Sequence, residues 1–145
     1  MKHQTLITTQ AVSKRMANVH LKRGPEETLL AKELWHHGYR YRLNYKKLPG
    51  SPDIAIQKYH IAVFVDGEFW HGHDWENRKQ RLKNNREYWI EKIEENMARD
   101  SRVDKELVKA GWVPVHFWSK EVKKDPLTCV RVIEELIFDQ KIQFE

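Results

Sequence analysis

Residues 52–71 read PDIAIQKYHIAVFVDGEFWH, and this stretch decides the fold. Its two β-forming segments, Asp53–Ile56 and His60–Val65, are separated by three residues, a spacing typical of a tight hairpin in the middle of a sheet. The second segment is almost wholly apolar, so we expect helices to cover its strand on both faces. If the strands are antiparallel, Asp53 at the start of one lies beside Asp66 at the end of the other.

The carboxylates of Asp53 and Asp66 predict a site for a hard divalent cation. With no lysine between them, they would repel unless a cation such as Mg²⁺ lies there, which accepts a few carboxylate oxygens and keeps several waters. The alternative interpretation is a pair of solvent-exposed turn aspartates. Glu68, two residues beyond Asp66, would add a ligand if the strand continues.

His71 is the candidate for proton transfer, because an imidazole accepts a proton near neutral pH when a carboxylate orients its second nitrogen. Simple packing is the alternative for this side chain. Glu27 could face the same cation from the first predicted helix, although glutamates in a first helical turn are common because they favour the helix dipole.

Phe69 and Trp70 follow the acidic pair directly and cannot both point into one core from a strand, so one of them should project outward. Together with Trp89 they are large apolar side chains near basic segments, which is how many proteins enter a stack of bases. Packing inside the core is the alternative for each of them.

The remaining sequence predicts one α/β domain in which helices flank a small mixed sheet. Residues 1–24 are expected to form a mobile basic arm, with Lys14 and Arg15 on DNA phosphates or simply in solvent, and residues 25–145 to form the domain. The expected elements after the arm are a helix from Pro25 closed by Gly38, a short strand at 39–43, the hairpin, a polar basic loop at 77–86, a helix at 88–109, a strand at 112–117 and a final helix from Pro126.

The composition of the chain indicates which kinds of partner and which compartment to expect. The chain has 26 Lys and Arg against 21 acids, a formal charge of +5, which suits a protein that meets a polyanion. A single cysteine excludes an internal disulfide and a cysteine-rich zinc site, and it fits a reducing compartment. No segment approaches the ~20 apolar residues of a membrane helix, and the polar start is not a secretory signal, so we expect a cytoplasmic protein without membrane contact.

Taken together, these motifs resemble the Vsr family of very short patch repair endonucleases, a branch of the PD-(D/E)xK restriction-endonuclease-like nucleases. The resemblance runs from about residue 13 to residue 118. It is carried by SKRM at 13–16, ETLL at 27–30, LPGSPD at 48–53, VFVDGEFWHG at 63–72, YWIEKI at 88–93, Asn96, Arg99, Asp100 and the Gly-Trp pair at 111–112.

The resemblance implies a restriction-endonuclease-like three-layer core and a Mg²⁺-dependent endonuclease, with Mn²⁺ as a possible substitute, that nicks duplex DNA beside a T:G mismatch. It also implies roles for particular residues. These are Asp53, Asp66, Glu68 and the Val65 backbone carbonyl at the metal, His71 as the base, Asp100 as its support, Glu27 as an accessory acid, and Phe69, Trp70, Trp89, Lys14, Arg15, Lys92, Asn96 and Arg99 on DNA.

The chain departs from the family pattern in two places. Asp66 stands where some members have histidine, and Glu68, Trp75 and Lys120 stand where the best-known members have the cysteines of a structural zinc site, which leaves His73 alone. We therefore predict no structural zinc, and expect the arm and the aromatic loop to be held by packing or to order on DNA. The expected protein is a monomer, with a possible accessory protein of mismatch repair.

Two other functions stay open at this point. One is a site-specific endonuclease of the homing type, because its catalytic domains are similar to those of the Vsr family. The other is a DNA-binding module of the same fold that does not cleave.

Overall fold

The computed structural model describes residues 24–144, so the predicted contacts of Lys14 and Arg15 lie outside the described residues. The helices are α2 (Pro25–His36), α3 (Trp75–Arg81), α4 (Arg86–Lys109), α5 (Ser119–Lys124) and α6 (Pro126–Phe144), and the strands are β1 (Arg42–Leu43), β2 (Ile54–Ile56), β3 (Ile61–Asp66) and β4 (Val113–Trp118). No helix among the described residues is long and apolar enough to cross a membrane.

The four strands form one mixed sheet in the order β1-β2-β3-β4. β2 and β3 are antiparallel, with Ile54 opposite Val63, so the predicted hairpin is confirmed. β4 lies parallel to β3, with Phe64 opposite His116 and Asp66 opposite Trp118. Because the helix α4 connects β3 to β4, residues about fifty positions apart in the chain become neighbours at the same end of the sheet.

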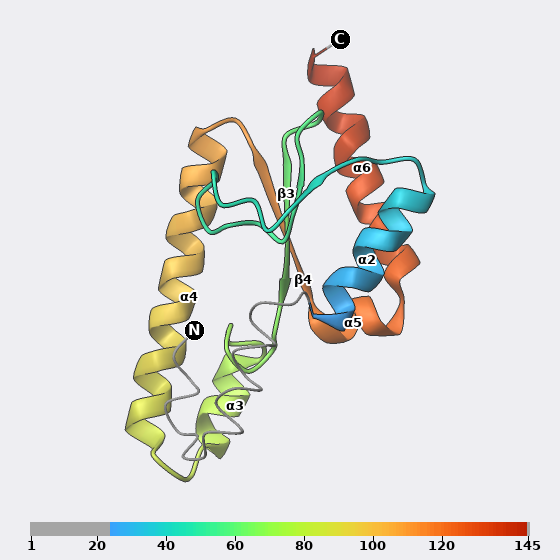
Figure 1. Ribbon diagram of the computed structural model, residues 1–145. Coiled ribbons are helices and arrows are strands. Elements are labelled where there is room, and N and C mark those ends of the chain that lie inside the picture. Colours follow the sequence, from blue (N-terminus) through green and yellow to red (C-terminus); the bar gives the residue numbers. More distant parts are fainter. Residues whose placement is uncertain (1–23, 145) are drawn as a thin grey trace.

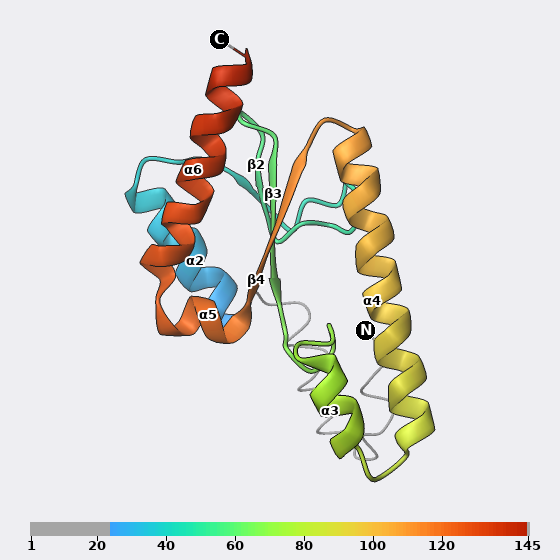
Figure 2. The same cartoon turned by 180° about the vertical axis from the view of Figure 1, so that it is seen from behind.

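Helices cover both faces of the sheet, as the apolar run in β3 predicts. α4 lies on one side of the sheet, and α2, α5 and α6 lie together on the other (Figures 1 and 2). Every residue of β3 is buried. This is the predicted α/β architecture, three layers with a mixed sheet in the middle, consistent with a restriction-endonuclease-like core.

The two faces of the sheet differ in their apolar content. The side covered by α2, α5 and α6 holds the main core, which includes Leu30, Leu34, Val63 and Ile133. The α4 side holds a smaller cluster, whose buried residues in the described part of the chain are Ala62, Phe64 and Leu107. Alternation along β3 therefore sends its odd-numbered residues into the main core and its even-numbered residues toward α4.

The prediction of a loop at 77–86 is wrong for its first half, because α3 spans Trp75–Arg81. Trp75 is buried, and its indole nitrogen donates to Glu94 of α4 at 3.0 Å. Lys79 forms an ion pair with the same carboxylate at 3.1 Å. These tertiary contacts hold a basic segment as a helix, which its own sequence pattern does not reveal.

The sequence prediction also missed α5, a helix of six residues between β4 and α6. Its start is fixed by Glu121, whose carboxylate accepts a hydrogen bond from the backbone amide of Trp118 at 2.9 Å. Val122 of the same turn is fully buried. A single buried residue is too little to produce a helical periodicity in the sequence.

Candidate active site

A polar pocket of about 480 Å³ opens on the α4 side of the sheet, where β3 ends. It is lined by residues of β3, β4, α4 and the segments before β2 and after β3: Gly50, Ser51, Asp53, Phe64, Val65, Asp66, His71, Arg99, Asp100, Val103 and His116. The structure thus brings Asp53, Asp66, His71 and Asp100 into one cavity, and their roles stay predictions.

Asp53 is fixed by the backbone of β3. Its Oδ2 accepts a hydrogen bond of 2.7 Å from the amide of Val65, because antiparallel pairing puts the start of β2 beside the end of β3. Burial raises the pKa of Asp53 to about 6, and the negative charge of Asp66 adds to this increase, while the Val65 amide opposes it. Asp53 is therefore an acid whose charge the surrounding protein does not fully compensate.

Glu27 reaches the same acid from the first turn of α2. Its carboxyl forms a hydrogen bond with the side chain of Asp53, which lowers the pKa of Asp53 in part. Two carboxyl groups in hydrogen-bond contact need a proton or a cation between them. This contact connects the helix on one side of the sheet to the pocket on the other.

His71 forms a short hydrogen bond with Asp100 of α4, with Nδ1 and Oδ2 separated by 2.5 Å. Its other ring nitrogen, Nε2, lies 4.0 Å from Oδ1 of Asp66. Burial opposes protonation of this imidazole, but the hydrogen bond to Asp100 and the charges of Asp66 and Asp100 outweigh it and raise its pKa. A ring whose Nδ1–H is held by a carboxylate presents Nε2 as the proton acceptor.

The turn that carries His71 is fastened to α4 by two contacts. Asn96 is buried, and its side-chain amide donates to the carbonyl oxygen of Trp70 at 3.1 Å. Gly72 has a φ of +74°, and a Cβ at this position would lie 2.3 Å from the sulfur of Met97. A glycine is required here because the turn approaches α4 this closely in a left-handed conformation.

His116 of β4 is a pocket residue that the sequence analysis missed. Its Nδ1 lies 2.7 Å from Oδ2 of Asp66, and its Nε2 lies 2.7 Å from Oδ1 of Asp104 on α4. Its ring stacks on Phe64 at 4.7 Å with an interplanar angle of 10°. Burial disfavours the charged ring, but the hydrogen bonds to Asp66 and Asp104 outweigh it and raise the pKa of His116 to about 9.

Positive groups do lie beside the acid pair, contrary to the expectation from the sequence. Among residues 24–144 no lysine lines the pocket, but Arg99 lines it and His116 contacts Asp66 directly. One signal was available in the sequence: a histidine between Val115 and Phe117 is a polar residue in an otherwise apolar strand. Its partner is set by strand register, which the sequence did not provide.

Phe69, Trp70 and Trp89 form one aromatic cluster next to the pocket. The ring centroids of Phe69 and Trp70 are 4.9 Å apart, and Trp89 lies 5.5 Å from Phe69 and 5.3 Å from Trp70. All three side chains are partly exposed. The cluster is thus neither a sealed core nor a set of isolated surface residues.

Two of the other predicted site residues, Glu68 and Lys92, do not line the pocket. β3 ends at Asp66, so the premise that Glu68 shares its strand face does not hold, and the Glu68 carboxylate accepts a hydrogen bond from the Lys120 amide at 2.9 Å. Lys92 borders a separate hollow on α4, while Arg99 lines the pocket itself. The Val65 carbonyl as a metal ligand stays a prediction.

The positions where the resemblance places zinc ligands are joined here by other contacts. Glu68 reaches the Lys120 amide, and His73 packs edge-on against Trp118 with centroids 4.7 Å apart. Trp75 is fastened to α4 through Glu94. Hydrogen bonds therefore supplement the expected packing in this region.

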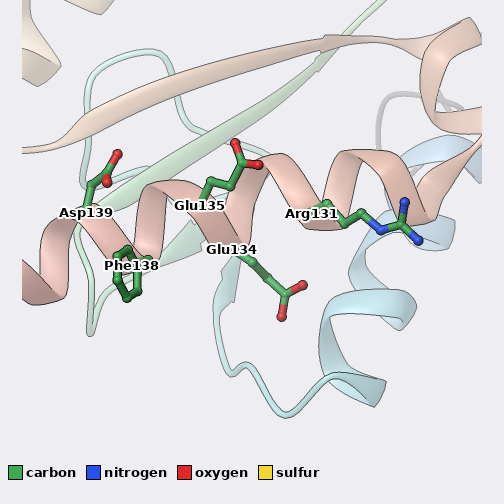
Figure 3. Close-up of a pocket in the computed structure, with 5 residues that line it drawn as sticks. All are labelled: Arg131, Glu134, Glu135, Phe138 and Asp139. Carbon is green, nitrogen blue, oxygen red and sulfur yellow. The ribbon is translucent and has the colours of Figure 1, made fainter.

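A second hollow, of about 540 Å³, lies on the outer surface of α6. Figure 3 shows that its lining side chains splay around the helix instead of converging on one point. They are Arg131, Glu134, Glu135, Phe138 and Asp139, which include no imidazole. We place the active site in the pocket at the end of β3, where acids and imidazoles from several elements meet.

The three-layer α/β core with an acid-and-imidazole pocket at the end of β3 defines a nuclease-like protein of the restriction-endonuclease type. Residues 5–77 match the family described as DNA mismatch endonuclease Vsr. This chain belongs to that family and is an enzyme of the endonuclease class.

Three relatives illustrate the similarity. The type II nicking enzyme V.HpaIIP of Haemophilus parainfluenzae is 46% identical over 81% of this chain and 83% of its own length. The type II nicking enzyme V.NmeDIP of Neisseria meningitidis serogroup C is 43% identical over 93% of this chain and 91% of its own. DNA mismatch endonuclease Vsr of Escherichia coli strain K12 is 31% identical over 86% and 80%.

Proposed function

We propose that this endonuclease uses Mg²⁺ to nick one strand of duplex DNA beside a T:G mismatch. The observation that carries the proposal is the His71–Asp100 pair, 2.5 Å apart, in the same pocket as Asp53 and Asp66. A base oriented by a carboxylate beside acidic metal ligands is the arrangement that hydrolysis of a phosphodiester needs.

In this proposal His71 is the general base. Asp100 holds its Nδ1–H, so Nε2 takes a proton from the attacking water. Arg99, which also lines the pocket, contributes positive charge toward the phosphate. Glu27, through its contact with Asp53, keeps that carboxyl in place as an accessory acid.

The residues present fit a divalent cation. Asp53 is partly buried, is repelled by Asp66 and touches a second carboxyl, so a cation would relieve an unfavourable accumulation of acids. Within residues 24–144 no group of three or more His, Cys, Asp and Glu side chains is placed to hold a metal ion, but Mg²⁺ commonly uses only one or two carboxylates and retains its waters. Asp53 and Asp66 would hold the ion, which when bound stabilises the negative charge that develops on the phosphate oxygens.

The aromatic cluster supports the choice of a mismatched substrate. Phe69, Trp70 and Trp89 are partly exposed next to the pocket, and insertion of such side chains costs less at a mismatched step than at a paired one. Asn96 acts in this proposal by holding the Trp70 backbone, while Lys92, Arg99 and the arm at residues 1–24 contact phosphates. We further propose a monomer that acts in the cytoplasm, where its DNA substrate is.

The test is a nick-mapping experiment with the complete chain. End-labelled duplexes that differ only in one base pair, T:G against T:A and C:G, are incubated with the protein in Mg²⁺, in Mn²⁺ and in a chelator. The expected result is a single nick beside the mismatched thymine that needs the divalent ion. Equal cleavage of the paired duplexes would contradict mismatch specificity, and cleavage in the chelator would contradict the metal.

A second candidate function is nicking at a fixed sequence without a mismatch. The names of two relatives, which call them type II nicking enzymes without mention of a mismatch, favour it. A duplex library with randomised flanks, with and without the T:G pair, separates the two functions. A preference for an intact paired sequence would favour the second.

A further inference from the structure

Asp66 has its two carboxylate oxygens directed to different imidazoles. Oδ2 lies 2.7 Å from Nδ1 of His116, and Oδ1 lies 4.0 Å from Nε2 of His71. Only one of these contacts is a hydrogen bond by its length. Rotation of the carboxylate is therefore restricted by His116, and the oxygen that faces His71 is the one left for the pocket.

His116 is itself held on three sides. Carboxylates only accept hydrogen bonds, so both ring nitrogens of His116 donate, one to Asp66 and the other to Asp104 at 2.7 Å. The ring face packs on Phe64 with an interplanar angle of 10°. Rotation of the imidazole would break both hydrogen bonds and the stacking contact together.

Asp104 connects this arrangement to the other imidazole. Asp100 and Asp104 are one turn apart on α4, so both face the sheet. The chain of contacts runs from Asp104 through His116, Asp66 and His71 to Asp100, and α4 closes it into a ring. Acids and imidazoles alternate along the five side chains from Asp104 to Asp100.

We propose that His116 and Asp104 are positioning residues for catalysis, which hold the Asp66 carboxylate in the orientation that presents Oδ1 to the pocket. The inference rests on the proposed metal-dependent nicking, which it deepens by adding two residues outside the acid cluster. His116 also occupies Oδ2 of Asp66 with a hydrogen bond, so it leaves one fewer carboxylate oxygen for a cation while it orients the other. His116 therefore has opposite effects on the orientation of the Asp66 carboxylate and on the binding of a cation.

This opposition provides the test. In His116→Leu, the rate of nicking at saturating DNA should fall by about tenfold to a hundredfold because Asp66 is free to rotate, with the KM for DNA within about twofold of the original. Binding of Mn²⁺ to the DNA-free protein, measured by electron paramagnetic resonance, should tighten by about threefold. Opposite changes in metal affinity and rate are not expected from a merely loosened pocket, which would weaken both.

Substitutions of Asp104 supply the second measurement. Asp104→Asn keeps an oxygen that accepts from Nε2 and should retain a rate within about threefold of the original, whereas Asp104→Ala should lose about tenfold. Glu106→Ala, an exposed position on the same helix, is the matched control and should change neither rate nor Mn²⁺ binding. Equal rates for Asp104→Ala and the original protein would overturn the proposal.

A spectroscopic measurement separates this inference from the proposed function. In ¹⁵N-histidine spectra of the metal-free protein, the ring of His116, assigned by its loss in His116→Leu, should show a hydrogen-bonded proton on Nδ1, the nitrogen that faces Asp66. If the original protein nicks no duplex, the proposed function fails, while the spectrum and Mn²⁺ binding still test the arrangement around Asp66. A His116 ring without a proton on Nδ1, or Mn²⁺ binding weakened by His116→Leu, would overturn it.

Discussion

The two faces of the sheet differ in the side chains that β3 presents to them, which are apolar on one face and include an acid on the other. Toward α2, α5 and α6, β3 presents Val63 and its odd-numbered neighbours to a large apolar core. Toward α4, it presents a small apolar cluster and then Asp66, which enters a ring of acids and imidazoles. One face stabilises the protein, and the other gathers titratable side chains, among them Asp53, whose charge opposes folding.

This difference indicates that the apolar core on one face supplies the stability that offsets the unfavourable acid on the other face. Asp53 is an acid whose pKa burial raises to about 6, so its ionised form is unfavourable in the folded protein. Leu30 and Leu34 on the opposite side are fully buried. The core on that side offsets the cost of the pocket, and substitutions on the two faces should therefore have separate effects.

The largest effect is expected for Asp53→Asn. Nicking should fall by about a thousandfold or more, because the proposed metal loses its main carboxylate. The metal-free protein should be at least as stable near pH 8, because the folded-state pKa of Asp53 is raised to about 6 and its ionised form lowers stability above that pH; this cost disappears as pH falls from about 6 toward the ordinary value of 3.8. Rates and thermal unfolding in a chelator check both expectations.

The control for this substitution is its effect on DNA binding. Asp53→Asn should bind duplex DNA about as well as the original protein in Ca²⁺ or chelator, as measured by fluorescence anisotropy. A clear loss of stability in the same variant would contradict the division between the two faces.

The second prediction concerns the opposite face. Leu34→Ala removes a fully buried side chain of the main core and should lower the free energy of unfolding by about 2–5 kcal/mol. The rate per folded molecule should stay within about twofold at a temperature where the variant is folded, because Leu34 is remote from the pocket lining. Urea unfolding and nicking assays measure the two quantities, and a large change in rate would show that the faces are coupled.

Trp89→Ala should have a smaller and more selective effect. Loss of a partly exposed ring that contacts Phe69 and Trp70 should reduce the preference for T:G over T:A duplexes by about tenfold, because base stacking on an aromatic ring is worth about 1–3 kcal/mol. Competition between the two duplexes in one reaction measures the ratio. An unchanged ratio would remove the cluster from mismatch selection.

The smallest effect is expected at Tyr39, whose hydroxyl donates to Glu134 of α6 at 2.8 Å. Burial and this contact raise the pKa of Tyr39 to about 12, above its ordinary value of 10.0. The neutral form is thus favoured in the folded state, so its contribution is complete below about pH 10 and is lost as pH rises toward about 12. The original protein should lose stability more steeply than Tyr39→Phe across this interval, and parallel curves in urea unfolding would contradict the expectation.

Much of the fold was predictable because its signals are local. The hairpin follows from two β-forming segments with a short connection, and the pairing of Ile54 with Val63 confirms it. Gly38, with φ of +93°, follows the end of its helix as expected, and Gly111 follows the end of α4 with φ of +85°. The proximity of Asp53 to Asp66 also follows from local order, since an antiparallel hairpin brings these ends together.

The missed features depend on contacts between distant segments. His116 meets Asp66 only because β4 pairs with β3 in one particular parallel register, and no pattern within either strand specifies that register. α3 is a helix because α4 holds Trp75 and Lys79 through Glu94. The sequence pattern therefore predicted the proximity of Asp53 and Asp66, which lie on one hairpin, and missed His116, which lies on β4.

The parallel pairing of β3 with β4 has a consequence for how the enzyme is made. Val65 and Phe117 lie opposite each other although α3 and α4 separate them along the chain. A nascent chain that has been synthesised only as far as the end of α4 still lacks His116 and β4, the strand that carries it. The pocket can therefore be completed only after β4 has been synthesised.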